Sequence, residues 1–110
     1  MRDSAPLVIA ASIAASLLLP APAAAAPQTH IVVMDKMKFG PVPARLRRGD
    51  IIVWVNKDMV RHTATAKDGS FNVDLPPGAK GRTVLRSSGA VAVLCKYHPG
   101  MRTMLKVAAR

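Results

Sequence analysis

The stretch CKYHPGM, at positions 95–101, decides how this chain is organised. Cys95 is the only cysteine of the sequence, and His98 and Met101 follow it at intervals of three residues. Thiolate, imidazole and thioether groups suit copper better than magnesium, calcium or manganese, which prefer oxygen ligands. Blue-copper centres use two histidines, one cysteine and a weakly bound axial methionine. The stretch supplies three of these four donors, so the second histidine is either His30 or His62.

The length of 110 residues predicts a single domain preceded by a leader. Residues 1–26 are typical of a secretory signal peptide, with one early arginine, a short apolar run and a small-residue cleavage site at Ala24–Ala26. The apolar run is too short for a stable membrane span, although a retained anchor is the alternative. Cleavage after Ala26 would leave residues 27–110 as one copper-binding domain without a membrane span.

An exported domain with one cysteine has no internal disulfide, so Cys95 is a free thiol, an intermolecular link or a metal ligand. A free thiolate outside the cytoplasm is open to oxidation, and a bound metal would protect it. The rival hypothesis is a nucleophilic cysteine activated by a histidine. Such a site needs an exposed thiolate and a third, orienting group, whereas a cysteine in a tight His/Met loop favours a closed metal site.

The charge balance limits the possible partners. The chain has 16 Lys and Arg residues against 6 acidic ones, a formal net charge of +10, and loss of residues 1–26 removes one charge of each sign. An excess of this size favours association with acidic protein surfaces, anionic lipid or nucleic acid, or simply keeps a small domain soluble. Nucleic acid is not expected as a partner, because an exported chain with four aromatic residues and no recognition motif lacks its signature.

Short extended segments separated by turn signals run through the whole of the mature chain. Segment 51–56 is apolar on both faces and is predicted to be a central strand. The segments predicted to be strands are 29–34, whose pattern 37–39 continues, 45–48, 51–56, 62–66, 82–86, 91–95 and 103–107, with 71–75 as a weak strand or a loop. None has a helical period. Seven or eight short strands at this spacing predict an all-β fold, a Greek-key antiparallel β-sandwich.

A sandwich of this kind explains how distant ligands meet. His62 follows the loop after the central strand, and loops at one end of a sandwich cluster in space. His30 lies beside the N-terminus of the domain and is expected to be a solvated residue on the first strand. Strand phase places Met104 on the solvated face of the last strand, whereas Met101 precedes that strand in a bend that Gly100 permits.

Several segments together resemble the cupredoxins, and most of all the amicyanin group within that family. They are residues 35–39, 48–50 and 53–56, His62, and residues 95–101 with their short Cys-x-x-His-x-x-Met spacing. The resemblance covers residues 29–108. By position, it implies that His62, Cys95, His98 and Met101 are the ligands of one type 1 copper ion. It also implies a small monomeric periplasmic protein that carries single electrons and is not an enzyme.

The sequence departs from the family pattern at positions that affect the site and its partners. The residue after the first histidine ligand is usually Asn, which ties the two ligand loops together; here it is Thr63, whose hydroxyl can make the same bridge. Arg61 replaces the usual Pro, and the apolar docking patch is reduced to Pro99, Met37 and Val60. The resemblance and the net charge therefore imply redox partners of the dehydrogenase or c-type cytochrome class, with acidic docking surfaces.

Two other functions remain open at this point. A periplasmic carrier that donates or buffers copper would use the pairs Met34/Met37 and Met101/Met104 as Cu(I) ligands, although such spacings are also typical of core methionines. A small enzyme with Cys95 as nucleophile is the other, and the sequence offers no base-orienter pair for it.

Overall fold

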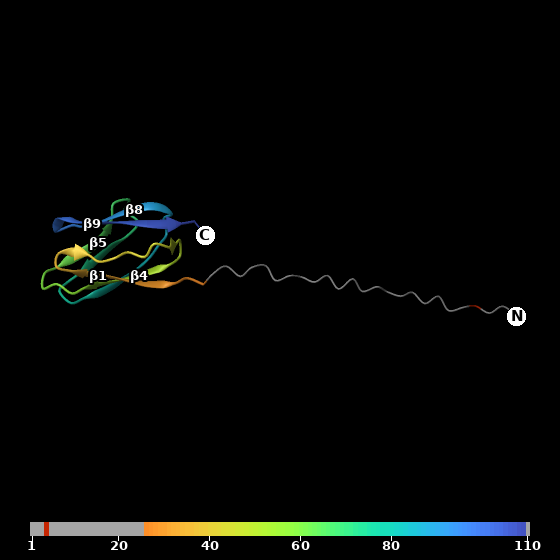
Figure 1. Cartoon of the computed structure of the whole chain (residues 1–110), viewed down its shortest axis with the longest axis horizontal. Helices are drawn as coiled ribbons and strands as arrows, with labels where there is room; N and C mark the ends of the chain where they lie inside the picture. The colour runs from red at the N-terminus through yellow and green to blue at the C-terminus, as the bar shows by residue number, and fades with distance from the viewer. Residues whose placement is uncertain (1–3, 5–25, 110) are drawn as a thin grey trace.

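The computed structural model describes residue 4 and residues 26–109, so the predicted signal peptide lies almost entirely outside the described residues. Nine strands form two sheets in the described part of the chain, packed as a sandwich (Figure 1). One sheet has the order β2-β1-β4-β7 and the other the order β3-β9-β8-β5-β6. The strands are β1 (Thr29–Asp35), β2 (Lys38–Phe39), β3 (Leu46–Arg47), β4 (Ile51–Asn56), β5 (His62–Ala66), β6 (Asn72–Leu75), β7 (Lys80–Val84), β8 (Gly89–Cys95) and β9 (His98–Ala108).

The predicted fold class, an all-β sandwich, is confirmed. β4 lies inside its sheet between β1 and β7, as its apolar sequence predicted. Most neighbouring strands are antiparallel, but β1 pairs with β4 and β3 pairs with β9 in parallel. The parallel pairs arise because the chain crosses between the sheets before it returns to the neighbouring strand, which Greek-key connections allow. The count exceeds the expected seven or eight because β2, expected to continue β1, is a separate strand, and because β6 is a strand rather than a loop.

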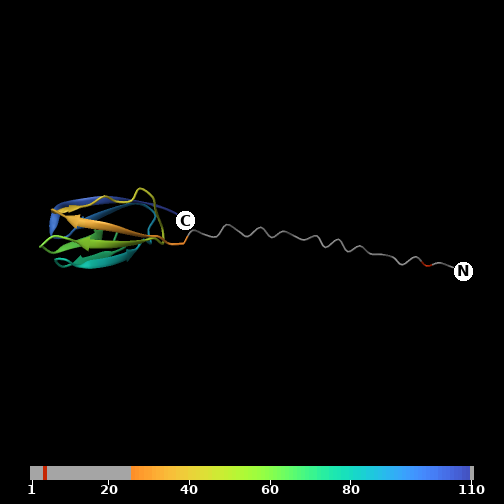
Figure 2. The same cartoon turned by 60° about the horizontal axis from the view of Figure 1, so that its bottom comes forward.

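The core lies between the two sheets and is centred on Trp54 of β4. Its ring is fully buried, and the ring centroids of Phe39 and Phe71 lie 5.9 Å and 6.0 Å away. Trp54 Nε1 donates a hydrogen bond to Thr83 Oγ1 on the neighbouring strand, at 3.3 Å. The buried ring therefore keeps a partner for its single polar group, as buried indoles require. The turned view shows β1, β4 and β7 of the first sheet side by side (Figure 2).

The last strand differs from its predicted extent. β9 begins at His98 rather than near Thr103, so Met101 lies inside the strand. Gly100 does not adopt a left-handed backbone, and the predicted bend at this residue is wrong. Met101 turns inward for another reason: it shares the buried phase of Leu105 and Val107, while Met104 is 49% exposed on the other face.

Candidate metal centre

The topology brings three of the four predicted ligand residues to one end of the sandwich. Cys95 is the last residue of β8, His98 is the first residue of β9, and these two residues are paired across the turn. β5 runs antiparallel to β8, so its first residue, His62, lies at the same end. His62 and Cys95 are buried, and His98 is half-buried. The described residues contain one cluster of potential metal ligands built from His, Cys, Asp or Glu, and it consists of these three.

The ligand atoms of these three side chains face one another. Cys95 Sγ lies 3.7 Å from His62 Nδ1 and 3.5 Å from His98 Nδ1, and the two nitrogens are 3.2 Å apart. Bonds of about 2.0 Å to nitrogen and about 2.3 Å to sulfur are usual for a first-row ion such as Zn²⁺. In a trigonal plane, such bonds separate sulfur from nitrogen by about 3.7 Å and the nitrogens by about 3.5 Å. The donor set therefore fits one transition-metal ion.

Asp58 fixes the orientation of the His62 ring. Its Oδ2 lies 2.7 Å from His62 Nε2. Because an ionised carboxylate only accepts hydrogen bonds, Nε2 carries the hydrogen and Nδ1 keeps its lone pair for a metal. The hydrogen bond from His62, followed by that from the Met37 N–H, lowers the pKa of Asp58 below 3.8. The carboxylate is therefore ionised at neutral pH. A carboxylate behind a histidine ligand is a common arrangement in metal sites.

The same carboxylate holds a strained turn. Asp58 Oδ1 accepts the N–H of Lys36 at 2.8 Å, and Oδ2 accepts the N–H of Met37 at 2.9 Å. Lys36 and Met37 have φ angles of 52° and 61°, which are unfavourable for residues other than glycine. Asn56 positions the carboxylate in turn, because its Oδ1 accepts the N–H of Asp58 at 2.9 Å. The loop before His62 is thus fixed from both the β1–β2 turn and β4.

Thr63 connects the two ligand segments, as predicted from its place after His62. Its backbone N–H donates to Cys95 Sγ at 3.4 Å, and its Oγ1 accepts the N–H of Lys96 at 2.9 Å. The hydroxyl also pairs with Thr65 Oγ1 at 2.9 Å. The first of these contacts places the partial positive charge of an N–H group against the sulfur.

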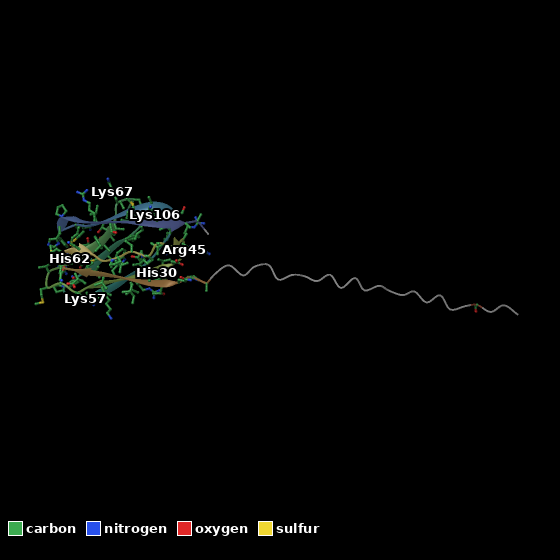
Figure 3. The ribbon with its side chains drawn as sticks, in the orientation of Figure 1. His30, Arg45, Lys57, His62, Lys67 and Lys106 are labelled. Atoms are coloured by element: carbon green, nitrogen blue, oxygen red, sulfur yellow. The ribbon has the colours of Figure 1, made fainter. Side chains whose placement is uncertain are left out.

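Met101 and His30 have different surroundings. Met101 is 2% exposed and belongs to the same cluster of buried residues as Cys95. His30 Nε2 lies 3.0 Å from Asp50 Oδ2, and Figure 3 shows this histidine on β1, away from the end that holds His62. The expectation of a solvated His30 is wrong, because its side chain is only 14% exposed and is hydrogen-bonded. The reason is that Asp50, just before β4, is itself buried and holds the His30 ring beside it.

Two features of the site were missed from the sequence. The first is Asp58, whose only signal was a carboxylate four residues before a candidate histidine ligand. The second is the exposure of Met59, which is 91% accessible beside the expected patch residues Met37 and Val60. All three side chains are at least 42% exposed and belong to the β1–β2 turn or the loop before His62.

Comparisons with known proteins agree with this arrangement at the level of the fold. No family model and no curated protein matches the chain. Amicyanin from Paracoccus versutus (Thiobacillus versutus) is similar in structure, with 23% sequence identity, a TM-score of 0.60, and coverage of 71% of this chain and 79% of that one. Two methionine-to-alanine variants of amicyanin in the Cu(I) form are also similar. The first gives 19% identity, a TM-score of 0.61, and coverage of 73% and 80%. The second gives 20% identity, a TM-score of 0.63, and coverage of 78% and 86%.

The resemblance noted in the sequence is thus matched by the three-dimensional structure. At these identities the likeness establishes the arrangement of the strands, and the chemistry of the site depends on the residues of this chain. The protein has the cupredoxin β-sandwich fold of the amicyanin structures, with two histidines and a cysteine gathered at one end.

Proposed function

We propose that this protein is a type 1 copper electron carrier, with His62, Cys95 and His98 as the strong ligands and Met101 as the weak axial one. The observation that carries the proposal is the convergence of two imidazole Nδ1 atoms and one thiolate sulfur at 3.2–3.7 Å. Copper bound there would supply a one-electron Cu(I)/Cu(II) couple. The two imidazoles, the thiolate and a distant thioether are the donor set of blue-copper centres.

The roles of the protein side chains follow from their contacts. Asp58 keeps the hydrogen of His62 on Nε2, and the Thr63 N–H stabilises the negative charge on Cys95. His98 is the least buried of the three strong ligands and is the candidate port for electrons at this end. A site closed by four protein donors has no open position for a substrate, unlike a catalytic metal site. The site is therefore suited to electron transfer and not to bond chemistry.

The copper-carrier alternative is less well supported by the methionines. Met34 is fully buried in the core, so it cannot share a metal at the surface with Met37. Met101 points inward and Met104 outward from the same strand. Neither predicted pair presents two thioethers to one surface site, which a protein that exchanges Cu(I) with a partner would need.

The visible spectrum of the protein with one equivalent of Cu(II) tests the proposal. An intense thiolate-to-copper band is expected, and replacing Cys95 by Ser should abolish it because the sulfur provides the transition. His30→Ala is the matched control, since this histidine is hydrogen-bonded to Asp50 and lies outside the ligand cluster. A colourless complex, or loss of the band in the His30 variant, would contradict the ligand assignment.

We also propose that the protein acts in the periplasm after removal of residues 1–26. The support is the sequence pattern of that segment, together with a lone cysteine whose thiolate a metal would protect. In the described part of the chain, no helix has the length and hydrophobicity needed to cross a membrane. N-terminal sequencing of the exported protein should begin at Pro27, and an uncleaved, membrane-bound product would contradict this.

A further inference from the structure

A hollow of about 600 Å³ opens beside the metal centre, on the outer side of the β8–β9 pair. We propose that this hollow docks a redox protein that presents an apolar side chain flanked by carboxylates. The inference rests on the proposed electron-carrier function and names the chemistry of the partner. It concerns a different surface from the exposed Met37, Met59 and Val60, which surround the loop before His62.

The floor of the hollow is an apolar strip on a sheet face that is normally polar. Ala92 lies opposite Met104, and Leu94 lies opposite Arg102, in the β8–β9 register. Val93, between the two β8 residues, is buried in the core, so Ala92 and Leu94 point outward. The solvated face of a sandwich sheet usually alternates polar residues with the buried ones. Three apolar side chains gathered there have no role in the core, and an apolar contact with a partner would explain them.

Three cations surround this floor. Lys67, Lys96 and Arg102 line the hollow, and no acidic residue is among the described residues that line it. Arg102 is held in place, because its Nε donates to the carbonyl oxygen of Pro99 at 3.0 Å. Lys67 projects from the outer face of the same sheet (Figure 3). A carboxylate-bearing partner would complement this rim, and charged rims of this kind orient the encounter and raise its rate.

The hollow also reaches the ligand residue itself. Cys95 contributes to the lining of the hollow and to the metal-ligand cluster. A partner docked here would lie against the backbone on either side of the thiolate, and the electron would not need to leave through His98. Copper held by these residues would accept one electron from a reduced centre in the partner. No proton, bond or group is transferred.

A blocked five-residue peptide with a central phenylalanine and two glutamates on each side is the probe. Amide chemical shifts of the copper-loaded protein in its diamagnetic Cu(I) form are followed during titration with the peptide. Residues of β8 and β9 around Ala92, Leu94 and Met104 should move together and saturate. Lys67→Glu should weaken binding at least about fivefold more than Lys80→Glu, which makes the same change of charge on the other sheet. Met104→Ser should weaken it more than Ile31→Ser, a matched loss of an exposed apolar side chain.

Three outcomes would overturn the proposal. The first is saturable binding whose shifts are confined to Met37, Met59 and Val60, which surround the loop before His62. The second is equal weakening by the Lys67 and Lys80 variants, which would show general charge attraction. The third is the absence of peptide binding while vesicles containing phosphatidylserine do bind at the hollow. A protein that fails to turn blue with Cu(II) refutes the proposed function separately. The peptide titration can still be carried out on that protein, because strands β8 and β9 alone form the floor.

Discussion

Replacing Asp58 by Asn tests whether the carboxylate behind His62 prepares the metal site. The amide has nearly the same shape, but it places an NH₂ group where one carboxylate oxygen now accepts hydrogen bonds. Asp58 accepts three of them, from His62 Nε2 and from the N–H groups of Lys36 and Met37. An amide oxygen can keep only part of this set. The His62 ring is then free to carry its hydrogen on Nδ1, the atom that must bind the metal.

The size of the effect follows from these contacts. Losing the partner of a histidine ligand typically lowers metal affinity ten- to a hundredfold, or by about 1.4–2.7 kcal/mol. The metal-free protein should also lose about 2 kcal/mol of unfolding free energy, because backbone N–H groups of the turn lose a charged acceptor. This figure is the upper end of the expected loss, because the contacts with Lys36 and Met37 are exposed and water can replace part of the lost acceptor.

Two measurements separate these effects. Copper affinity is obtained by competition with a chelator, followed by the thiolate-to-copper band, and stability by urea unfolding of the metal-free protein. Asp74→Asn is the matched control, because Asp74 pairs with Arg61 at 3.2 Å on the surface and both side chains are more than half exposed. If the two variants bind copper equally well, Asp58 does not prepare the site and the account of the His62 tautomer is wrong.

Three more predictions concern other parts of the molecule. Thr63→Val should lower the unfolding free energy, measured in urea, by about 1–3 kcal/mol, because the N–H of Lys96 loses its acceptor. Thr65→Val should lower it less, and equal losses would contradict the bridging role of Thr63. Although burial raises the pKa of Asp50, hydrogen bonds from its neighbours outweigh this and lower it below 3.8. The ionised Asp50 therefore stabilises the protein above pH 3.8, and this stability is lost as the pH falls through the lower pKa that Asp50 has in the folded protein. Asp50→Asn should make the unfolding free energy depend less on pH in the acid range. An unchanged pH dependence would refute this. Met101→Gln should shift the reduction potential and the spectrum while Met104→Gln leaves both unchanged, and the reverse result in voltammetry would exchange the two roles.

Local patterns in the sequence predicted much of the fold. The apolar run of β4 predicted a strand between two neighbours, and the alternation after Gly100 predicted that Met104 would face solvent. These features depend on side-chain burial with a period of two, which a single segment displays by itself. The three-residue spacing from Cys95 to His98 likewise predicted that both would lie together at the turn between the last two strands.

What the sequence did not predict depends on contacts between distant segments. Asp58 contacts Lys36 and Met37, which lie 22 and 21 positions earlier, and nothing in the local pattern indicates that pairing. The buried pair of His30 and Asp50 joins residues 20 positions apart. The parallel pairing of β3 with β9 requires the full path of the chain. Polar contacts of this kind become visible only when the strands have been placed.

The 33-residue separation between His62 and Cys95 has a consequence for how the protein matures. The chain must complete β6 and β7 and return before β8 can pair with β5, and such non-local pairings form slowly, on a scale of about milliseconds to seconds. Until then the nascent chain offers Cys95, His98 and the weak donor Met101, a fragment that lacks His62, one of the three strong donors. Capture of the ion is thus coupled to closure of the last strands. A chain that crosses a membrane unfolded would acquire its metal only at its destination.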